Sequence, residues 1–213
     1  MLCNHLSILS WLLDVLILPV RLWRAVADRW RAPALDAPPP RDARAELRGL
    51  DFGGKPRYLA VIDFECNCGR KVAFEIVEFP VVVADLDKLE IVGEFQTFVR
   101  PEEHPALTGL CRRLTGIRQS DVDEAPLLVD ALAAVDAFLK RTVPAGESFA
   151  VAADGPTDFK RFLHKECLRK RLACPAYYYR WVDVSKHLLM HHPDTKCTLV
   201  EKVLRAGLVW VGE

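Results

Sequence analysis

Two carboxylates, Asp63 and Glu65, follow a short apolar run and have the residue types and spacing for chemistry. The run, 58–62, has the length and composition of a β-strand that is buried on both faces. Residues i and i+2 of a strand project to the same face, so both carboxylates point one way and Phe64 points the other way. Neighbouring carboxylates repel each other unless a cation lies between them, and the usual cation is a hard divalent metal ion. The alternative is a pair of solvated acids at the end of a strand.

A third acid is available in the segment 150–158, where a short strand is followed by a Gly-Pro turn and the start of a helix. Asp158 opens that helix, and Asp154 precedes the turn. An aspartate at a helix start is commonly an N-cap or a partner of the helix dipole. The residues alone therefore leave two interpretations of each aspartate, a structural one and a metal-binding one.

The elements that would position these acids alternate between strand and helix. Strands are expected at 58–62, 75–86, 90–99, 148–153 and 181–184, with the second and third forming an antiparallel hairpin. Helical periodicity is expected at 107–114, 125–140, 158–172 and 196–206. This order predicts an α/β fold with a mixed sheet of about five strands flanked by helices. Such sheets bind ligands at the carboxyl ends of their strands, which is where Asp63 and Glu65 lie.

The chain divides into three parts. Residues 1–31 form a hydrophobic and Arg-rich segment, residues 32–57 a Pro- and Arg-rich linker, and residues 58–213 the domain with the candidate acids. The apolar run 6–20 is shorter than the roughly 20 residues of a membrane span. A helix on the domain itself and weak membrane association through residues 6–26 are both compatible with it. We expect residues 1–40 to supply no catalytic group and to pack weakly, so that deleting residues 1–50 leaves the thermal midpoint within a few degrees.

Composition excludes several classes of protein. Of the 213 residues, 51% are hydrophobic and 27% charged, which excludes a disordered or low-complexity chain. Lys+Arg and Asp+Glu are both 29, so net charge does not indicate nucleic-acid binding and any basic surface must be local. The seven cysteines include no C-x-x-C pair, which favours a reducing, intracellular compartment over a disulfide framework or a zinc ribbon. We expect a cytoplasmic or nuclear protein, with N-terminal anchoring or organelle targeting as alternatives.

Several motifs, in their order, resemble the DEDD-type 3′→5′ exonucleases of the ribonuclease H-like fold. The resemblance is greatest to the exoribonucleases of histone-mRNA 3′ ends and RNA interference. It covers about three quarters of the chain, from Tyr58 onward. The motifs that carry it are Val61-Ile62-Asp63-Phe64-Glu65 with Cys68, Glu75-Ile76-Val77-Glu78-Phe79-Pro80-Val81-Val82, Leu114-Thr115-Gly116-Ile117-Arg118-Gln119 with Val122-Asp123 and Ala125-Pro126, Asp154-Gly155-Pro156-Thr157-Asp158, and Trp181-Val182-Asp183-Val184.

The resemblance implies a function and a set of site residues. It implies that Asp63, Glu65 and Asp158 hold two divalent ions, Mg²⁺ with Mn²⁺ as an alternative, and that Glu65 is also catalytic. Asp158 fits better than Asp154, because the family's second acid lies at the start of the helix. Glu65 and Cys66 correspond to contacts with the terminal nucleotide, and Thr115 belongs to the segment that flanks it. Thr115-Gly116 is equally compatible with a simple helix-ending turn.

The implied substrate is the 3′ end of single-stranded RNA, hydrolysed to nucleoside 5′-monophosphates, and DNA is not excluded. Basic residues after Asp158 are either a solvated helix face or a patch that binds phosphates, chiefly through Lys160, Arg161 and Lys165. Arg169, Lys170 and Arg171 extend this face. The run 177–179 of three tyrosines is expected either to stack on bases or to pack against the sheet.

The family's third motif, a histidine followed five residues later by an aspartate, has no counterpart in the sequence. The positions five residues after His164, His187, His191 and His192 hold no acid. We therefore expect a domain that is incomplete at its C-terminus and weakly active as written. We also expect an extension carrying the motif to raise cleavage by roughly 10²-fold or more. The alternative hypothesis is a nucleic-acid-binding or scaffold protein that keeps the fold without turnover.

Overall fold

The computed structural model describes residues 56–70, 72–88 and 90–184. A mixed sheet of six strands forms its centre, with the order β2-β3-β1-β5-β6 and with β4 paired to β3. Strands β1 and β3 are antiparallel, whereas β1, β5 and β6 run parallel. The strands are β1 (Tyr58–Ile62), β2 (Glu65–Gly69), β3 (Val72–Asp85), β4 (Glu90–Phe98), β5 (Phe149–Ala153) and β6 (Trp181–Asp183).

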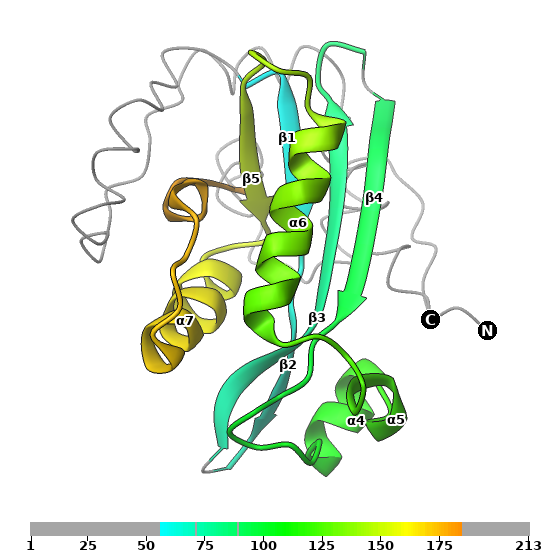
Figure 1. Ribbon diagram of the computed structural model, residues 1–213, viewed down its shortest axis with the longest axis vertical. Helices are drawn as coiled ribbons and strands as arrows, with labels where there is room; N and C mark the ends of the chain where they lie inside the picture. The colour runs from blue at the N-terminus through cyan, green and yellow to red at the C-terminus, as the bar shows by residue number, and fades with distance from the viewer. Residues whose placement is uncertain (1–55, 71, 89, 185–213) are drawn as a thin grey trace, which may run out of the picture.

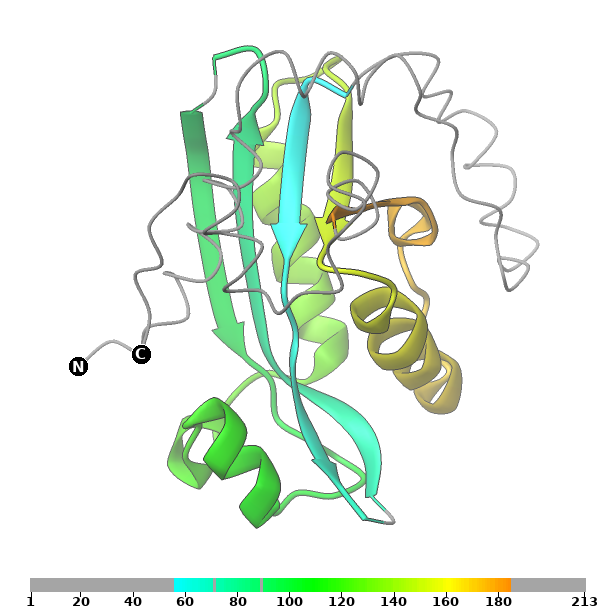
Figure 2. The ribbon, with the colours of Figure 1, turned by 180° about the vertical axis from the view of Figure 1, so that it is seen from behind.

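The helices lie on one face and at one end of this sheet. Helix α6 runs along the face that is seen in Figure 1, and α4 and α5 lie beside β2 at the lower end. The rear view in Figure 2 shows α7 beyond the β5 side of the sheet. The helical segments are α4 (Gly109–Thr115), α5 (Gln119–Val122), α6 (Leu128–Thr142), the π-helix η1 (Thr157–Leu163), α7 (His164–Lys170) and the 3-10 helix η2 (Ala176–Tyr179).

Both faces of β1 are buried. Tyr58, Ala60 and Ile62 of β1 belong to the core cluster that includes the apolar face of α6. Leu59 and Val61, on the other face of β1, also have 0% exposed surface. The strand is thus buried on both faces, as its continuous apolar sequence predicts.

Close packing of α6 against the edge strand β4 depends on one glycine. A Cβ atom at Gly93 would lie 2.7 Å from Cγ2 of Thr142, at the end of α6. Real Cβ atoms do not approach other atoms this closely, so a side chain at this position would require the Thr142 side chain or the helix to shift. The absence of a side chain at Gly93 therefore permits this close approach of helix and strand.

The predicted hairpin is confirmed, whereas one strand is additional to the prediction. Strands β3 and β4 pair antiparallel, and the Asp85 carboxylate caps the turn by accepting the backbone N–H groups of Asp87 and Lys88. Strand β2 is a separate element, whereas the sequence pattern puts Asp63 and Glu65 together at the end of one strand. The predicted helix 158–172 is divided into η1 and α7. The predicted helix 196–206 and the segments before residue 56 lie outside the described residues.

Candidate nuclease site

The Asp63-Phe64-Glu65 segment crosses a short interruption between β1 and β2. Ile62 pairs with Val81, and Glu65 pairs with Glu78, so β1 and β2 follow one register along β3. That register puts Pro80 opposite Asp63, and a proline has no N–H to donate to the ladder. Asp63 therefore lies in a break in pairing and Glu65 begins β2, whereas the sequence predicts both acids at the end of one strand.

The predicted alternation of the three side chains is nevertheless kept. Asp63 and Glu65 are half-buried, whereas Phe64 is only 4% exposed. The Phe64 ring packs edge-on against Phe79 at 4.6 Å and against Phe159 at 6.4 Å between centroids. This aromatic packing fixes the segment and turns both carboxylates away from the core.

Asp158 reaches the same place from the helix that follows β5, the parallel neighbour of β1. It lies in the first turn of the π-helix η1 and is 6% exposed. Its Oδ1 accepts the backbone N–H of Phe64, the residue between the two other acids, at 2.9 Å. Short π-helical segments are uncommon and often occur at functional sites. The structure thus brings Asp158 to the Asp63-Phe64-Glu65 segment, while Asp154 lies half-buried just after β5.

The three acids interact electrostatically. Burial and the charges of Asp63 and Glu78 raise the pKa of Glu65 to about 8. Burial and the charge of Asp63 raise the pKa of Asp158 to about 7, although the hydrogen bond from Phe64 opposes this shift. Burial and like charge thus disfavour the ionised form of both carboxylates. Glu78 was assigned no role from the sequence, and its cross-strand position opposite Glu65 is the signal that identifies it.

This donor set fits a hard divalent cation. Closely spaced carboxylate oxygens are the ligands that Mg²⁺ and Mn²⁺ prefer, and a bound cation would favour the ionised form of each acid. Among the described residues, no group of three or more His, Cys, Asp or Glu side chains is already arranged to hold an ion. The assignment of Asp63, Glu65 and Asp158 as ligands therefore stays a prediction, which their mutual repulsion supports.

The Thr115-Gly116 segment is a helix-ending turn. The Thr115 hydroxyl donates to the Cys111 carbonyl at 2.9 Å and accepts the N–H of Ile117 at 3.1 Å. Gly116 has φ = 72°, a left-handed conformation that glycine adopts without strain at a helix end. Thr115 is 5% exposed, whereas the Leu114 side chain is 71% exposed. Leu114 is thus the more accessible of the two, although the sequence pattern points to Thr115.

Cys66 points into the protein. Its side chain is 7% exposed and belongs to the core cluster, and burial raises the pKa of its thiol. The alternation along β2 explains this orientation, because Glu65 faces outward and its neighbour must face inward. A contact between Cys66 and a nucleotide, which the sequence predicts, would have to involve its backbone.

The basic residues after Asp158 do not form one continuous solvated face. Arg169 pairs with Glu103 at 3.1 Å, and Lys170 is in an ion-pair cluster with 9% of its side chain exposed. Arg161 lies over the Phe74 ring at 4.4 Å and Lys160 over the Trp181 ring at 5.6 Å. Lys165 and Arg161 are exposed. The predicted phosphate-binding patch is therefore reduced to Lys160, Arg161 and Lys165, with Arg171 exposed at the end of α7.

The three tyrosines pack against the protein. Tyr178 has 0% exposed surface, Tyr177 contacts Phe149 at 5.3 Å, and Tyr179 stacks on His164 at 4.4 Å between ring centroids. Of the two predicted roles, packing is the one that the structure shows.

His164 has a structural environment. Its Nε2 lies 3.0 Å from the Tyr178 carbonyl, its ring stacks on Tyr179, and burial lowers its pKa. These contacts occupy the only histidine that the described residues place after Asp158. His187, His191 and His192 lie outside the described residues.

Comparison with known proteins gives consistent matches. The model of the RNase_T family, described as exonuclease, matches residues 60–205. A rat protein named 3′-5′ exoribonuclease 1 is 36% identical over 134 residues, which are 61% of this chain and 39% of that protein. The Drosophila melanogaster 3′-5′ exonuclease Snipper is 30% identical over 177 residues, covering 73% of this chain and 62% of that protein. The chain thus spans about two fifths of the length of the rat relative.

Solved structures agree with these matches. The nuclease domain of 3′hExo, a DEDDh family member bound to rAMP, superposes with a TM-score of 0.70 and 30% identity, covering 74% of this chain and 82% of that one. A structure of a 3′-exonuclease that recognises the histone mRNA stem-loop gives a TM-score of 0.69 at 30% identity, covering 74% of this chain and 73% of that one. The predicted α/β, ribonuclease H-like sheet with flanking helices is therefore confirmed.

Proposed function

The chain belongs to the RNase_T family of exonucleases, and on that premise we propose that it hydrolyses single-stranded RNA from the 3′ end to nucleoside 5′-monophosphates. The relatives named above are 3′-5′ exoribonucleases or exonucleases. One observation in the structure carries the proposal. The Asp158 carboxylate accepts a hydrogen bond from the backbone N–H of Phe64, the residue between Asp63 and Glu65, so Asp158 lies beside the segment that carries the two other acids.

We propose that Asp63, Glu65 and Asp158 hold two divalent ions, of which Mg²⁺ is the natural one and Mn²⁺ a substitute. Ions bound there would lower the pKa of a coordinated water and neutralise the charge of the scissile phosphate. The protein's own contribution is to fix the carboxylates. Phe64 does this through its ring on the core side and through its N–H on the side of Asp158.

The 3′-terminal nucleotide is proposed to lie between β2 and the end of α4. Exposed Leu114 offers an apolar surface for a base, and Thr115 and the backbone of Cys66 are the further contacts that the proposal includes. Helix α4 packs against β2, the strand that begins at Glu65, which supports this location. A base in this position would leave its phosphate near the carboxylates.

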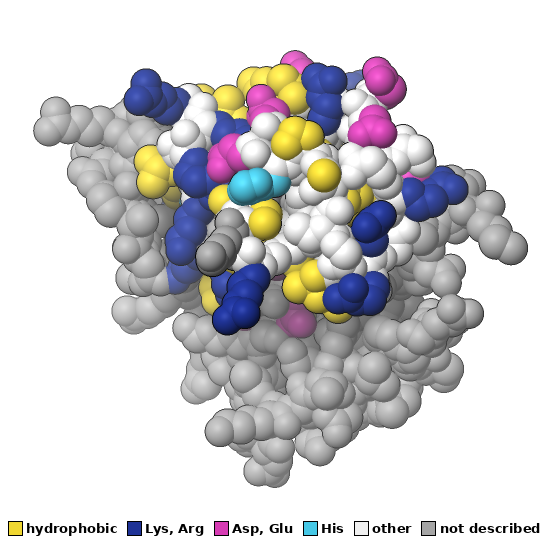
Figure 3. All heavy atoms as spheres, turned by 90° about the horizontal axis from the view of Figure 1, so that it is seen from below, with side chains coloured by type: hydrophobic (Ala, Val, Ile, Leu, Met, Phe, Trp, Pro, Cys, Tyr) yellow, Lys and Arg dark blue, Asp and Glu magenta, His cyan; other side chains and the backbone are white. Residues whose placement is uncertain are grey.

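The RNA backbone is proposed to follow basic side chains at the surface. Lys160, Arg161 and Lys165 are one candidate path, as the sequence indicates. The exposed residues Arg112 and Arg113 of α4 are a second path, adjacent to exposed Leu110 and Leu114. Figure 3 shows basic side chains spaced around apolar ones on the lower face of the molecule, the face to which α4 and α5 belong.

The test is a product analysis with 5′-labelled single-stranded RNA and Mg²⁺ or Mn²⁺. We expect slow formation of a ladder of products that shorten from the 3′ end, with nucleoside 5′-monophosphates released, and no cleavage with EDTA. The same assay with DNA of equal sequence determines sugar preference. Salt-sensitive RNA binding without any cleavage would support the alternative hypothesis of a binding protein.

Two further proposals concern location. The described residues contain five free cysteines and no helix long and apolar enough to cross a membrane. We propose an intracellular protein, cytoplasmic or nuclear, with weak membrane association through residues 6–26 as an additional property. Fractionation of cells that express the chain with and without residues 1–31 tests both proposals.

A further inference from the structure

A buried glutamate, Glu75 of β3, accepts hydrogen bonds from the backbone of the loop between β4 and α4. Its Oε1 accepts the backbone N–H groups of Glu102 and Glu103 at 2.8 and 3.0 Å, and its Oε2 accepts that of His104 at 2.7 Å. Glu75 has 0% exposed surface. Burial raises the pKa of this carboxyl, but the backbone donors and Lys170 lower it by more, so the net shift is downward. The group is thus ionised and anchors the loop by its main chain.

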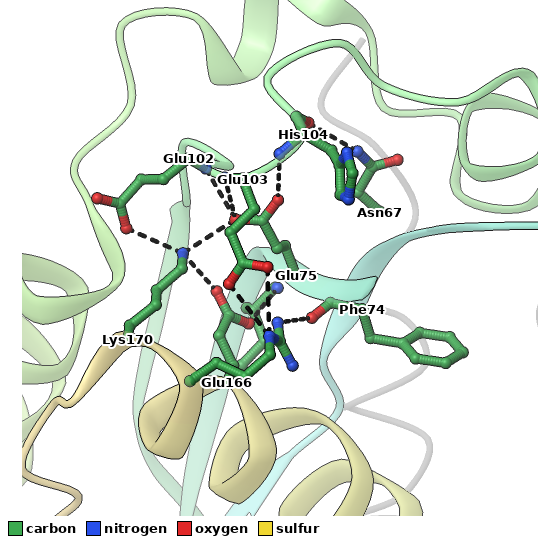
Figure 4. A network of polar contacts seen from close by, with 10 residues as sticks. Asn67, Phe74, Glu75, Glu102, Glu103, His104, Glu166 and Lys170 are labelled. Atoms are coloured by element: carbon green, nitrogen blue, oxygen red, sulfur yellow. Dashed lines mark hydrogen bonds and ion pairs between the residues drawn. The ribbon is translucent and has the colours of Figure 1, made fainter. Parts of the chain in front are cut away.

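Helix α7 is tied to the same carboxylate. Lys170 Nζ lies 3.0 Å from Glu75 Oε1, 2.8 Å from Glu166 Oε1 and 2.9 Å from Glu102 Oε2. The other oxygen of Glu166 accepts the N–H of Ile76, next to Glu75, at 2.7 Å. Figure 4 shows Lys170 and Glu166 rising from one helix toward Glu75 and the loop. The network therefore joins β3, the loop and α7.

The strand that carries Glu65 joins this network through Asn67. Asn67 pairs with Glu75 across β2 and β3 and has 0% exposed surface. Its Nδ2 donates to the carbonyls of His104 and Ala106 at 3.0 and 3.2 Å, and its Oδ1 accepts the N–H of Thr108 at 3.0 Å. The Thr108 side chain in turn caps α4. The loop is thus held along its length from two adjacent strands.

Stability alone does not account for this arrangement. Buried ion pairs are weak stabilisers compared with apolar packing, because removing charges from water is costly. A buried network that is joined by several hydrogen bonds and ion pairs nevertheless favours one geometry of the segments that it links. Here it fixes three segments that meet at the candidate site: β2 with Glu65, η1–α7 with Asp158, and the loop that leads to α4 and Leu114.

We propose that Glu75, Glu166 and Lys170 are positioning residues, which set α4 and its Leu114-Thr115 segment relative to the acids and so determine how tightly the 3′-terminal nucleotide is held. This inference rests on the proposed function for its substrate, whereas the coupling itself is a property of the fold. The residues touch no substrate in this scheme and act through the loop and the helix.

Two isosteric variants perturb the network from different elements. Glu75→Gln places an amide NH₂ against a backbone N–H or Lys170, and Glu166→Gln keeps an oxygen for Ile76 but sets an NH₂ against Lys170. The control is Glu147→Gln, which also breaks an ion pair, to Arg57 at 2.9 Å, but near the N-terminal ends of β1 and β5. If Glu75→Gln is recovered unfolded, Glu166→Gln carries the test.

Hydrogen exchange in peptides covering residues 100–106 and 109–116 is the first measurement. We expect both variants to speed exchange by about tenfold in both peptides, as loss of one hydrogen bond implies, and the control to change neither. Faster exchange confined to residues 100–106 would overturn the proposed coupling, because α4 would then be placed independently of the network.

The second measurement is the steady-state cleavage of short single-stranded RNA, well below the thermal midpoint of each variant. A positioning role predicts that KM rises about tenfold while kcat changes little, because nucleotide contacts loosen and the carboxylates stay in place. An unchanged KM despite faster exchange at residues 109–116 would overturn the role in substrate holding. If the unmodified chain neither binds nor cleaves RNA, the proposed function fails, and hydrogen exchange alone then decides the coupling.

Discussion

At the scale of single residues, the Asp158 carboxylate has two separable tasks. One oxygen accepts the Phe64 N–H, and the negative charge contributes to a site where burial and Asp63 already raise its pKa. An asparagine side chain has the same shape and retains an acceptor oxygen. The substitution therefore removes the charge and leaves the structural hydrogen bond.

We expect Asp158→Asn to reduce RNA cleavage at least about 100-fold while leaving the fold intact, because the proposed metal ligand is lost. Cleavage rates measure the loss of activity. The thermal midpoint without metal reports whether the fold is intact, and its rise on adding Mn²⁺ reports metal binding. Asp154→Asn is the matched control, since Asp154 lies four residues earlier, after β5, and should retain nearly the original rate. A loss in Asp154→Asn with little change in Asp158→Asn would instead assign the second ligand to Asp154, in the turn.

Residue types and spacing identify Asp63, Glu65 and Asp158, but not how they meet. The hydrogen bond between Phe64 and Asp158 joins residues 94 positions apart, and its donor is a backbone N–H. A pattern of residue types cannot predict such a contact. The inward orientation of Cys66 follows from strand alternation only once β2 is recognised as a strand. Glu78 was missed because its importance depends on the register between β2 and β3.

At the scale of elements, α7 supplies the only cation that the described residues place against Glu75 and Glu166. We expect Lys170→Met to lower the free energy of unfolding by about 3–5 kcal/mol, because two buried carboxylates would lose their counter-charge. The matching drop in thermal midpoint is roughly 10 °C. Chemical denaturation gives the free energy directly.

Lys165→Met, on the same helix but exposed, is the control and should change stability by no more than about 0.5 kcal/mol. A comparable loss in both variants would mean that α7 depends on surface charge rather than on the buried cluster.

Helix α4 and the η1–α7 segment are the two alternative surfaces on which the RNA backbone could bind. We expect Arg112→Ala with Arg113→Ala to reduce the slope of log binding constant against log salt concentration by about 1 for each phosphate that an arginine no longer neutralises. Fluorescence anisotropy over a range of salt concentrations measures this slope. Arg161→Ala with Lys165→Ala is the competing pair, and a larger effect there would favour the path that the sequence indicates.

Long periodic elements were predictable and short ones were not. The hairpin β3–β4 and helix α6 follow from alternation and from the apolar spacing of residues such as Leu128, Leu132 and Val135. Strand β2 is five residues of mixed polarity, and its pairing arises from β3 rather than from its own sequence. The division between η1 and α7 was equally hidden, because the π-helical and α-helical turns share one apolar pattern.

At the scale of the whole molecule, the acids couple stability to pH and to metal. The pKa values of Glu65 and Asp158 are raised to about 8 and about 7, whereas an unfolded chain loses these protons near pH 4. The metal-free folded state therefore holds protons that the unfolded state has released. Its stability must fall as pH rises from about 4 to about 8.

We expect the thermal midpoint of EDTA-treated protein to fall from about pH 5 to about pH 8, and Mg²⁺ or Mn²⁺ to restore it at the higher pH but not at the lower, where protons compete for the carboxylates. Differential scanning fluorimetry across this range is the measurement. Glu65→Gln should flatten the metal-free profile and weaken the response to metal. A midpoint that is independent of metal at the higher pH would speak against a cation site at these acids.

The hydrogen bond from the Phe64 amide to Asp158 has a consequence for genetics. Its donor belongs to the main chain, so exchanging the Phe64 side chain cannot delete it. A mutational scan would score position 64 by how well each residue fills the space beside Phe79. If other large apolar residues were tolerated, the scan would suggest that residue 64 serves only to pack the core. Only proline removes the N–H donor. A score for Phe64→Pro that is much lower than the scores of other poorly packing substitutions would therefore reveal the hydrogen bond.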